Sequence, residues 1–130
     1  MTPSEMSQRI VLVEDDLDIR SILDQLLTDA GYSVMALHDG RDILELNFPA
    51  PSLFILDINL PNIDGIAICK FLKLQAQLKS VPVLVLSANR SLKSKALIAG
   101  AQTFIEKPFK IERLLSEVSY CLAGQTLLSR

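Results

Sequence analysis

Short apolar runs alternate with helical patterns along the chain, and this alternation predicts the fold. The apolar runs show no regular in/out alternation, which is typical of strands buried on both faces of a parallel sheet. The first run, at residues 10–13, reads Ile-Val-Leu-Val and is rich in β-branched side chains, which favour strands. We expect strands at residues 10–13, 32–37, 53–56, 81–86 and 103–105.

Each run is followed by a segment with apolar residues at steps of three and four, as in a helix with one buried face. The clearest segment spans residues 16–30, where Ile19, Leu23 and Leu27 recur on one face and Gly31 supplies a stop. Repeated strand–helix units of this length predict one doubly wound α/β domain. We expect helices at residues 16–30, 40–48, 64–76, 92–99 and 110–122.

Composition narrows the class of protein. A chain of 130 residues with 49% hydrophobic residues can bury a real core and is not disordered. No apolar stretch approaches the roughly 20 residues of a membrane span, and residues 1–9 lack the layout of a signal peptide. We therefore expect a cytoplasmic protein with no membrane contact. Cys69 and Cys121 lie in apolar helical patterns and predict buried, reduced thiols, and His38 predicts an exposed loop residue.

The net charge of −2 conceals an asymmetry along the chain. Residues 1–69 carry 12 acids and 3 bases, whereas residues 70–130 carry 3 acids and 10 bases. A split of this kind is usually solvated surface, and a mixed fold can bring the two halves side by side. The basic stretch at residues 90–95, close to Lys107 and Lys110, favours an acidic protein partner. We do not expect direct nucleic-acid binding.

Polar side chains follow four of the five expected strands. Ligands of open parallel sheets bind beyond the carboxyl ends of the strands, so these side chains should meet at one edge. Neighbouring carboxylates repel one another unless a cation lies between them, and a set of oxygens without His or Cys favours Mg²⁺. A lysine and a hydroxyl beside that ion can hold phosphoryl oxygens, which predicts a nucleophilic role for Asp57. The four strand ends carry Glu14-Asp15-Asp16, Asp57, Ser87 and Glu106-Lys107.

These motifs are similar to those of the receiver domain of two-component response regulators. The likeness runs from about residue 8 to residue 122, and the most specific part is the Leu-Asp-x-x-Leu-Pro-x-x-Asp-Gly segment. It implies a receiver domain at residues 8–123, a tail at 1–7, and a tail or the start of a linker at 124–130. The segments that carry the likeness are 11–16, 56–65, Ser87-Ala88 and Lys107-Pro108-Phe109.

The resemblance implies a flavodoxin-like sheet of order 2-1-3-4-5 with five helices, and a role for each site residue. Asp57 would accept the phosphoryl group, and the Lys107–Pro108 bond would be cis. The domain would catalyse only its own phosphorylation and dephosphorylation, without being a turnover enzyme. The remaining roles are Mg²⁺ binding by Glu14, Asp15, Asp57 and the Asn59 carbonyl, phosphoryl contact by Ser87 and Lys107, switching by Ser87 and Phe104, and tuning of dephosphorylation by Asn59 and Asn89.

The same resemblance implies partners. A histidine kinase or a histidine phosphotransfer protein would donate the phosphoryl group, and a homodimer would form through the segments 92–99, 103–105 and 110–122. Two features depart from the family: Ser87 and Lys107 are 20 positions apart, about two fewer than expected, and residues 89–95 are basic. The alternative function is a pseudo-receiver, an interaction module that is not phosphorylated. An aspartate-nucleophile phosphohydrolase needs a second acid where Asn59 stands.

Overall fold

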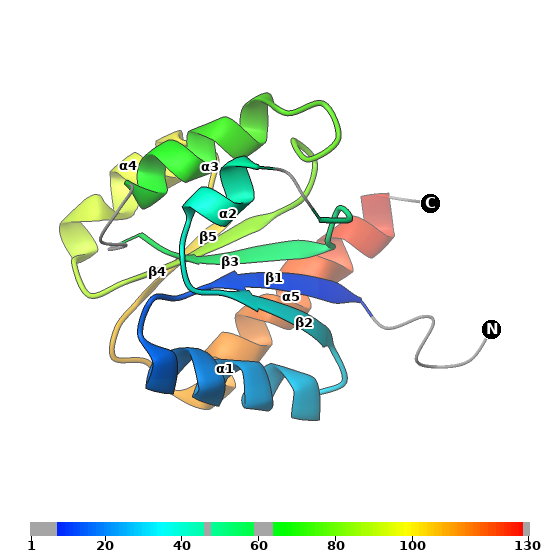
Figure 1. Ribbon diagram of the computed structural model, residues 1–130, viewed down its shortest axis with the longest axis vertical. Helices are drawn as coiled ribbons and strands as arrows, with labels where there is room; N and C mark the ends of the chain where they lie inside the picture. The colour runs from blue at the N-terminus through cyan, green and yellow to red at the C-terminus, as the bar shows by residue number, and fades with distance from the viewer. Residues whose placement is uncertain (1–7, 46–47, 59–63, 129–130) are drawn as a thin grey trace.

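The computed structural model describes residues 8–45, 48–58 and 64–128 (Figure 1). Within these ranges five strands alternate with five α-helices, as the sequence pattern predicted. The strands are β1 (Arg9–Val13), β2 (Ser33–Leu37), β3 (Leu53–Asp57), β4 (Val83–Ser87) and β5 (Thr103–Glu106). The helices are α1 (Leu17–Asp29), α2 (Arg41–Leu44), α3 (Gly65–Leu74), α4 (Lys93–Ile98), preceded by a 3-10 turn η1 (Arg90–Leu92), and α5 (Ile111–Leu128).

The strands form one parallel sheet in the order β2-β1-β3-β4-β5, which confirms the predicted flavodoxin-like topology. The register brings the carboxyl ends into line, because Val13 pairs with Leu56 and Asp57 pairs with Leu86. Ser87 pairs with Glu106 at the next strand boundary. The residues that follow the strands therefore meet at one edge of the sheet.

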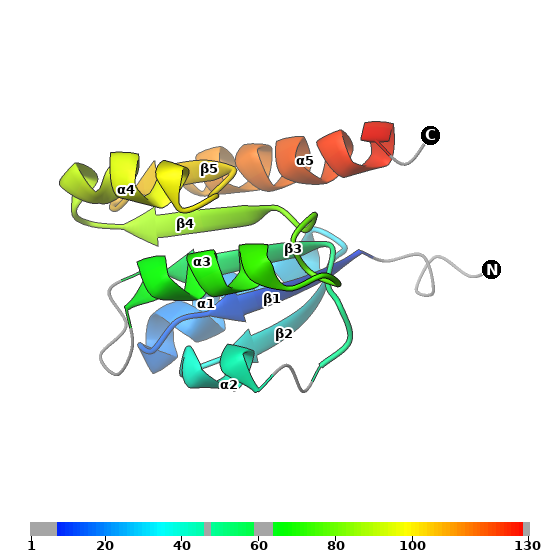
Figure 2. The same cartoon turned by 90° about the horizontal axis from the view of Figure 1, so that it is seen from above.

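Helices cover both faces of the sheet. α1 and α5 lie on one face, and α2, α3 and α4 lie on the other (Figures 1 and 2). Alternate residues of β1 point into two different core clusters: Ile10 and Leu12 pack with α1 and α5, and Val11 and Val13 pack on the opposite side. β1, β3 and β4 are central and buried on both faces, so their apolar runs need no alternation.

β2 is less buried than predicted, because we expected every strand to be buried on both faces. Its residues alternate between exposed and half-buried, and Met35 is 41% exposed. β2 lies at the edge of the sheet and pairs only with β1 among the described strands. An edge strand has a neighbour on one side only, so it is buried less completely than the central strands.

All five helices depart from their predicted bounds by at least one residue, and α2 and α5 depart the most. α2 ends at Leu44 rather than residue 48, and Phe48 instead packs edge-on against Phe54, with ring centroids 6.1 Å apart. The segment before α4 forms η1, where the Asn89 side chain accepts a hydrogen bond from the Ser91 N–H. α5 continues to Leu128 rather than residue 122, since Ala, Gln and Leu in that stretch favour helix and one glycine does not stop it.

Both thiols are free and buried, as predicted, and His38 is exposed. Burial raises the pKa of both thiols, and that of Cys121 reaches about 11. A thiol with a raised pKa forms little thiolate at neutral pH, so neither cysteine is a reactive nucleophile. No helix in the described part of the chain is long and apolar enough to cross a bilayer.

The first turn of α3 packs closely against the end of β3, and we expect Gly65→Ala to destabilise the domain. A Cβ at Gly65 would lie 2.7 Å from Ile58 Cβ and also against the Ile58 backbone. Overpacking of this kind costs about 2–3 kcal/mol. Urea denaturation measures the change, with the exposed Ala67→Ser on the same helix as control. An unchanged free energy of unfolding in Gly65→Ala would contradict this packing.

Candidate functional site

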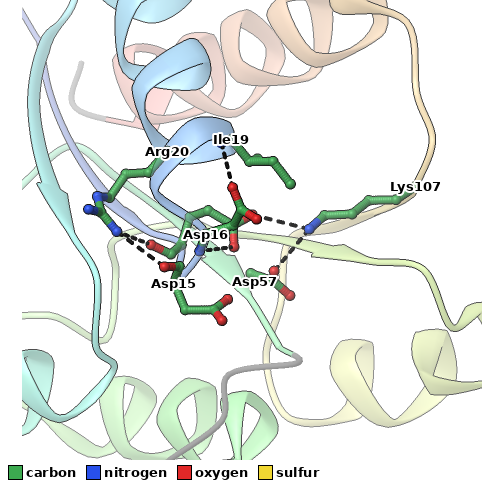
Figure 3. Close-up of polar contacts among 7 residues, drawn as sticks. Asp15, Asp16, Ile19, Arg20, Asp57 and Lys107 are labelled. Atoms are coloured by element: carbon green, nitrogen blue, oxygen red, sulfur yellow. Dashed lines mark hydrogen bonds and ion pairs between the residues drawn. The ribbon is translucent and has the colours of Figure 1, made fainter.

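Three carboxylates from two neighbouring strands meet at the carboxyl edge of the sheet. Glu14 and Asp15 follow β1, and Asp57 ends β3 (Figure 3). One oxygen from each carboxylate lies within 4.8 Å of the others. Glu14 and Asp57 are 1% and 4% exposed, whereas Asp15 faces solvent. The structure thus brings together the acids that the strand ends predicted.

Lys107 joins two of these carboxylates. Its Nζ lies 2.9 Å from Asp57 Oδ2 and 3.2 Å from Glu14 Oε1 (Figure 3). Burial alone would lower the pKa of Lys107, but hydrogen bonds and attraction from Asp57 and Glu14 outweigh this effect and raise it. The amine is therefore a fixed cation beside the Asp57 oxygens. The Lys107–Pro108 peptide bond is cis, as predicted.

Glu14 is an acid of this cluster with a strongly raised pKa. Burial raises its pKa to about 7, and the nearby Asp57 adds to the rise while Lys107 opposes it. Burial and a like charge both disfavour the carboxylate form. Glu14 therefore ionises near neutral pH rather than in acid.

This pKa predicts a pH dependence. As pH rises from 4.5 to about 7, Glu14 ionises in the unfolded chain before it ionises in the folded domain. The unfolded state then binds fewer protons, so the free energy of unfolding should fall across this window, by about 3 kcal/mol for a shift of this size. Metal binding favours the ionised carboxylate, so Mg²⁺ affinity should rise over the same window.

Urea denaturation in a chelator measures the first effect, and calorimetric titration with Mg²⁺ measures the second. Glu14→Gln is the control, because an amide cannot ionise and the slope due to residue 14 should disappear. A slope as steep in Glu14→Gln as in the parent would show that another group carries the pH dependence.

The β1–α1 loop is braced by Asp16, one of the acids at the end of the first strand, and by Arg20, which the sequence reasoning did not assign to the site. Arg20 Nη1 donates to the carbonyl of Glu14 at 2.9 Å and contacts that of Asp15 at 3.4 Å, while the Asp16 carboxylate caps α1 by accepting from the Ile19 N–H at 2.9 Å (Figure 3). The sequence contained a signal for the role of Arg20, because side chains in the first turn of a helix point back towards its N-terminus. Arg20 thereby fixes the backbone that carries two acids.

The end of β2, which the sequence reasoning left out of the site, carries one more buried acid. Asp39 is 8% exposed and accepts hydrogen bonds from the Arg41 backbone N–H and guanidinium, the shortest at 2.6 Å. The bonds to the backbone and side chain of Arg41 fix the start of α2. Asp39 is a structural residue rather than a further member of the carboxylate cluster.

Ser87 ends β4 and is completely buried. Its Oγ accepts a hydrogen bond from the Asn89 N–H at 3.0 Å, and its carbonyl accepts from the Lys107 N–H at 2.8 Å. The Asn89 side chain is exposed, but its Oδ1 is engaged with both the Ser91 N–H and the Ser91 hydroxyl. Asn89 therefore shapes the loop as well as being placed near Ser87. Asn59 lies outside the described residues.

Phe104 lies on β5 and is 6% exposed, packed in the same core cluster as Ala96, Ala99 and Ala101. Burial of an apolar ring is favourable, which accounts for this position. The role of Phe104 in switching stays a prediction.

The donor set fits a hard divalent cation. Glu14, Asp15 and Asp57 offer carboxylate oxygens that are close enough to share one ion, and no His or Cys takes part among the described residues. Mg²⁺ is held by few protein carboxylates and keeps several waters, which suits a cluster with one exposed member. The site is compatible with a divalent metal on the chemistry of its oxygens.

Comparison with known proteins identifies the family to which the chain is similar. The sequence profile described as the response regulator receiver domain matches residues 10–119. The chain is 40% identical to the transcriptional regulatory protein YrkP of Bacillus subtilis over 94% of its length, and 36% identical to response regulator MprA of Mycobacterium bovis over 87%. It spans about half the length of these curated relatives, 52% and 50% respectively.

Solved structures show the same fold. A putative response regulator of Chloroflexus aurantiacus superimposes with a TM-score of 0.83 and 31% identity, covering 90% of this chain and 98% of that one. The chemotaxis response regulator CheY4 of Vibrio cholerae also gives a TM-score of 0.83, with 30% identity over 90% of this chain and 100% of that one.

Proposed function

This chain belongs to the response regulator receiver domain family of two-component systems, and we propose that Asp57 is its phosphoryl acceptor. One observation carries the proposal: Asp57 is buried in an acidic cluster, yet its Oδ2 lies 2.9 Å from the cationic Nζ of Lys107. The carboxylate is placed to act as a nucleophile, and the lysine is placed to pair with an added phosphoryl group.

The donor is a phosphohistidine on a histidine kinase or on a histidine phosphotransfer protein. An Asp57 carboxylate oxygen forms a bond to phosphorus as the bond between phosphorus and the imidazole nitrogen breaks. The electron pair of that bond stays on the imidazole, which then takes up a proton. Lys107 pairs with a phosphoryl oxygen, and the Ser87 hydroxyl donates a hydrogen bond to another.

Glu14, Asp15 and Asp57 would hold the metal, with Arg20 fixing the backbone of the first two. Bound Mg²⁺ supplies positive charge that offsets the negative phosphoryl oxygens. Water later attacks phosphorus, the bond to Asp57 breaks, and inorganic phosphate leaves with the carboxylate restored. The domain thus acts on itself and is not a turnover enzyme.

Incubation with a small phosphodonor, with and without Mg²⁺, tests this function. Mass spectrometry should find one added phosphoryl group on Asp57 when Mg²⁺ is present and little without it. An unlabelled protein under conditions that label a known receiver would instead favour the pseudo-receiver, an interaction module without phosphorylation. The full set of Glu14, Asp15, Asp57, Ser87 and Lys107 supports phosphorylation.

The Ser87 hydroxyl should couple phosphorylation to the rest of the domain. Its Oγ now accepts from the Asn89 N–H, and contact with a phosphoryl oxygen would need a separation of about 2.5–3.0 Å. Ser87 would then draw the β4–η1 connection towards Asp57. We expect Ser87→Ala to accept phosphate but to show much smaller amide shifts in η1, α4 and β5 with beryllofluoride.

Nuclear magnetic resonance measures these shifts, and Ser116→Ala is the matched control because it removes an exposed hydroxyl on α5, outside the elements whose shifts are followed. Full-size shifts in Ser87→Ala would remove this hydroxyl from the coupling. Phe104→Ala tests the adjoining step, in which the buried ring transmits the displacement to the surface of α4, β5 and α5.

A further inference from the structure

Arg20 lies among acids but forms its hydrogen bonds with backbone carbonyls. None of the ion pairs between described residues includes Arg20. Its Nη1 instead donates to the carbonyl of Glu14 at 2.9 Å and contacts that of Asp15 at 3.4 Å (Figure 3). The position of the guanidinium is therefore set by the backbone of the loop rather than by an ion pair. The acids within six positions of it are Glu14, Asp15, Asp16 and Asp18.

The two carbonyls belong to two acids of the carboxylate cluster. Successive side chains of an extended chain point to opposite sides, and Glu14 is buried whereas Asp15 faces solvent. Even so, one oxygen of each carboxylate lies within 4.8 Å of the other and of Asp57. For both carboxylates to face one ion, the backbone must keep a particular turn at these two residues. The contacts from Arg20 to both carbonyls restrict that turn.

The rest of the loop is fixed by the first turn of α1. The Asp16 carboxylate accepts from the Ile19 N–H at 2.9 Å, and the Arg20 N–H donates to the Asp16 carbonyl at 2.9 Å. The Asp16 N–H lies 3.4 Å from Glu14 Oε2. These bonds hold the loop at its helical end. The Arg20 side chain adds the bond that reaches back past Asp16 to the end of β1.

We propose that Arg20 is a positioning residue that presents the Glu14 and Asp15 carboxylates to a divalent cation. Ordering the backbone of a residue costs conformational entropy, so a loop that is held before the cation arrives binds it more tightly than a loop that the cation must order. Arg20 acts through the backbone of these acids and is not itself a ligand. The inference rests on the metal site of the proposed function, but not on phosphorylation.

The charge of Arg20 opposes cation binding, and this makes a positioning role separable from an electrostatic one. A guanidinium is always positively charged in proteins, and like charges repel. If Arg20 acted on the site through charge alone, its removal would strengthen Mg²⁺ binding. If Arg20 positions the loop, its removal weakens binding even though a repulsion is relieved. The sign of the change in affinity therefore distinguishes the two roles.

Two variants of the whole chain test the proposal. Arg20→Met keeps an unbranched apolar stem and a residue that favours helix, but it removes the donors and the charge. Arg20→Lys keeps the charge but replaces the rigid fork of the guanidinium with one ammonium group. Isothermal titration with Mg²⁺ should show an affinity about tenfold lower in Arg20→Met, as for residues that support a metal ligand. Arg20→Lys should show a smaller loss.

Arg9→Met is the matched control, because Arg9 is exposed at the opposite end of β1 and its replacement also removes one positive charge. This variant should keep the parent affinity. In metal-free protein, amide shifts caused by Arg20→Met should map to the β1–α1 loop and the first turn of α1. An unchanged or higher Mg²⁺ affinity in Arg20→Met would overturn the proposal. If that variant does not fold, an unchanged affinity in Arg20→Lys would do so.

Labelling of Asp57 by a small phosphodonor gives an independent readout. Arg20 acts on the loop of Glu14 and Asp15 rather than on Asp57, so Arg20→Met should need about tenfold more Mg²⁺ for half-maximal labelling and should reach the parent rate at saturating Mg²⁺. A slower rate at saturating Mg²⁺ with unchanged metal affinity would also overturn the proposal. A parent that binds Mg²⁺ but is not labelled would contradict the proposed function alone, because the metal titration still decides the role of Arg20.

Discussion

Asp57→Asn is expected to abolish phosphoryl labelling of the chain. The amide has almost the shape of the carboxylate, but its oxygen is a far weaker nucleophile and it carries no charge. In the variant, the amide carbonyl oxygen can stand where Asp57 Oδ2 lies in the parent, 2.9 Å from Lys107 Nζ. Lys107 would also keep its bond to Glu14. The loss should therefore be chemical rather than structural.

Removal of one of three neighbouring acids should also reduce repulsion in the cluster, so the fold should be kept. Labelling is followed by mass spectrometry and the fold by circular dichroism. Asp16→Asn is the matched control, since asparagine caps a helix as well as aspartate and Asp16 only caps α1. A phosphoaspartate at another position, formed in Asp57→Asn with the yield of the parent, would defeat the assignment of Asp57.

Asp15→Ala should lower Mg²⁺ affinity by about 100-fold or more, since loss of a ligand should cost at least as much as loss of a residue that only supports one. Asp15 is the exposed member of the cluster, so it can hold a metal that keeps several of its waters. Labelling of Asp57 by a small phosphodonor should fall with the loss of metal.

Isothermal titration with Mg²⁺ measures the affinity, and Asp18→Ala serves as control because this acid lies in the first turn of α1 outside the cluster. A second measurement separates ligation from stability. Without metal, Asp15→Ala removes a like charge and should not lower the free energy of unfolding. Parent-like Mg²⁺ affinity in Asp15→Ala would exclude its carboxylate as a ligand.

Much of the site could be predicted because parallel strands end at one edge. Once the strands were placed, Glu14, Asp57, Ser87 and Lys107 had to lie near one another, whatever the details of the helices. Order and topology follow from hydrophobic pattern, and the contacts between strand ends follow from topology.

Other features depend on packing that one-dimensional patterns do not contain. The burial of Phe104 depends on how its core cluster, which includes Ala96 and Ala99, is packed, and the raised pKa of Glu14 depends on its burial beside Asp57. The exposure of β2 depends on which strand lies at the edge. Arg20 was recognisable only from the backward tilt of helical side chains, a local rule that the strand-end reasoning did not use.

The position of Lys107 has a thermodynamic consequence. One ammonium group contacts both Glu14 and Asp57, so the chemical states of these two carboxylates cannot be independent. A phosphoryl group on Asp57 would compete with Glu14 for Lys107 and so change the affinity of Glu14 for a proton. Coupling between binding sites is reciprocal, so protonation of Glu14 would change the equilibrium of phosphorylation by the same factor. The phosphorylated fraction of the domain should therefore depend on pH as well as on the supply of the phosphoryl donor.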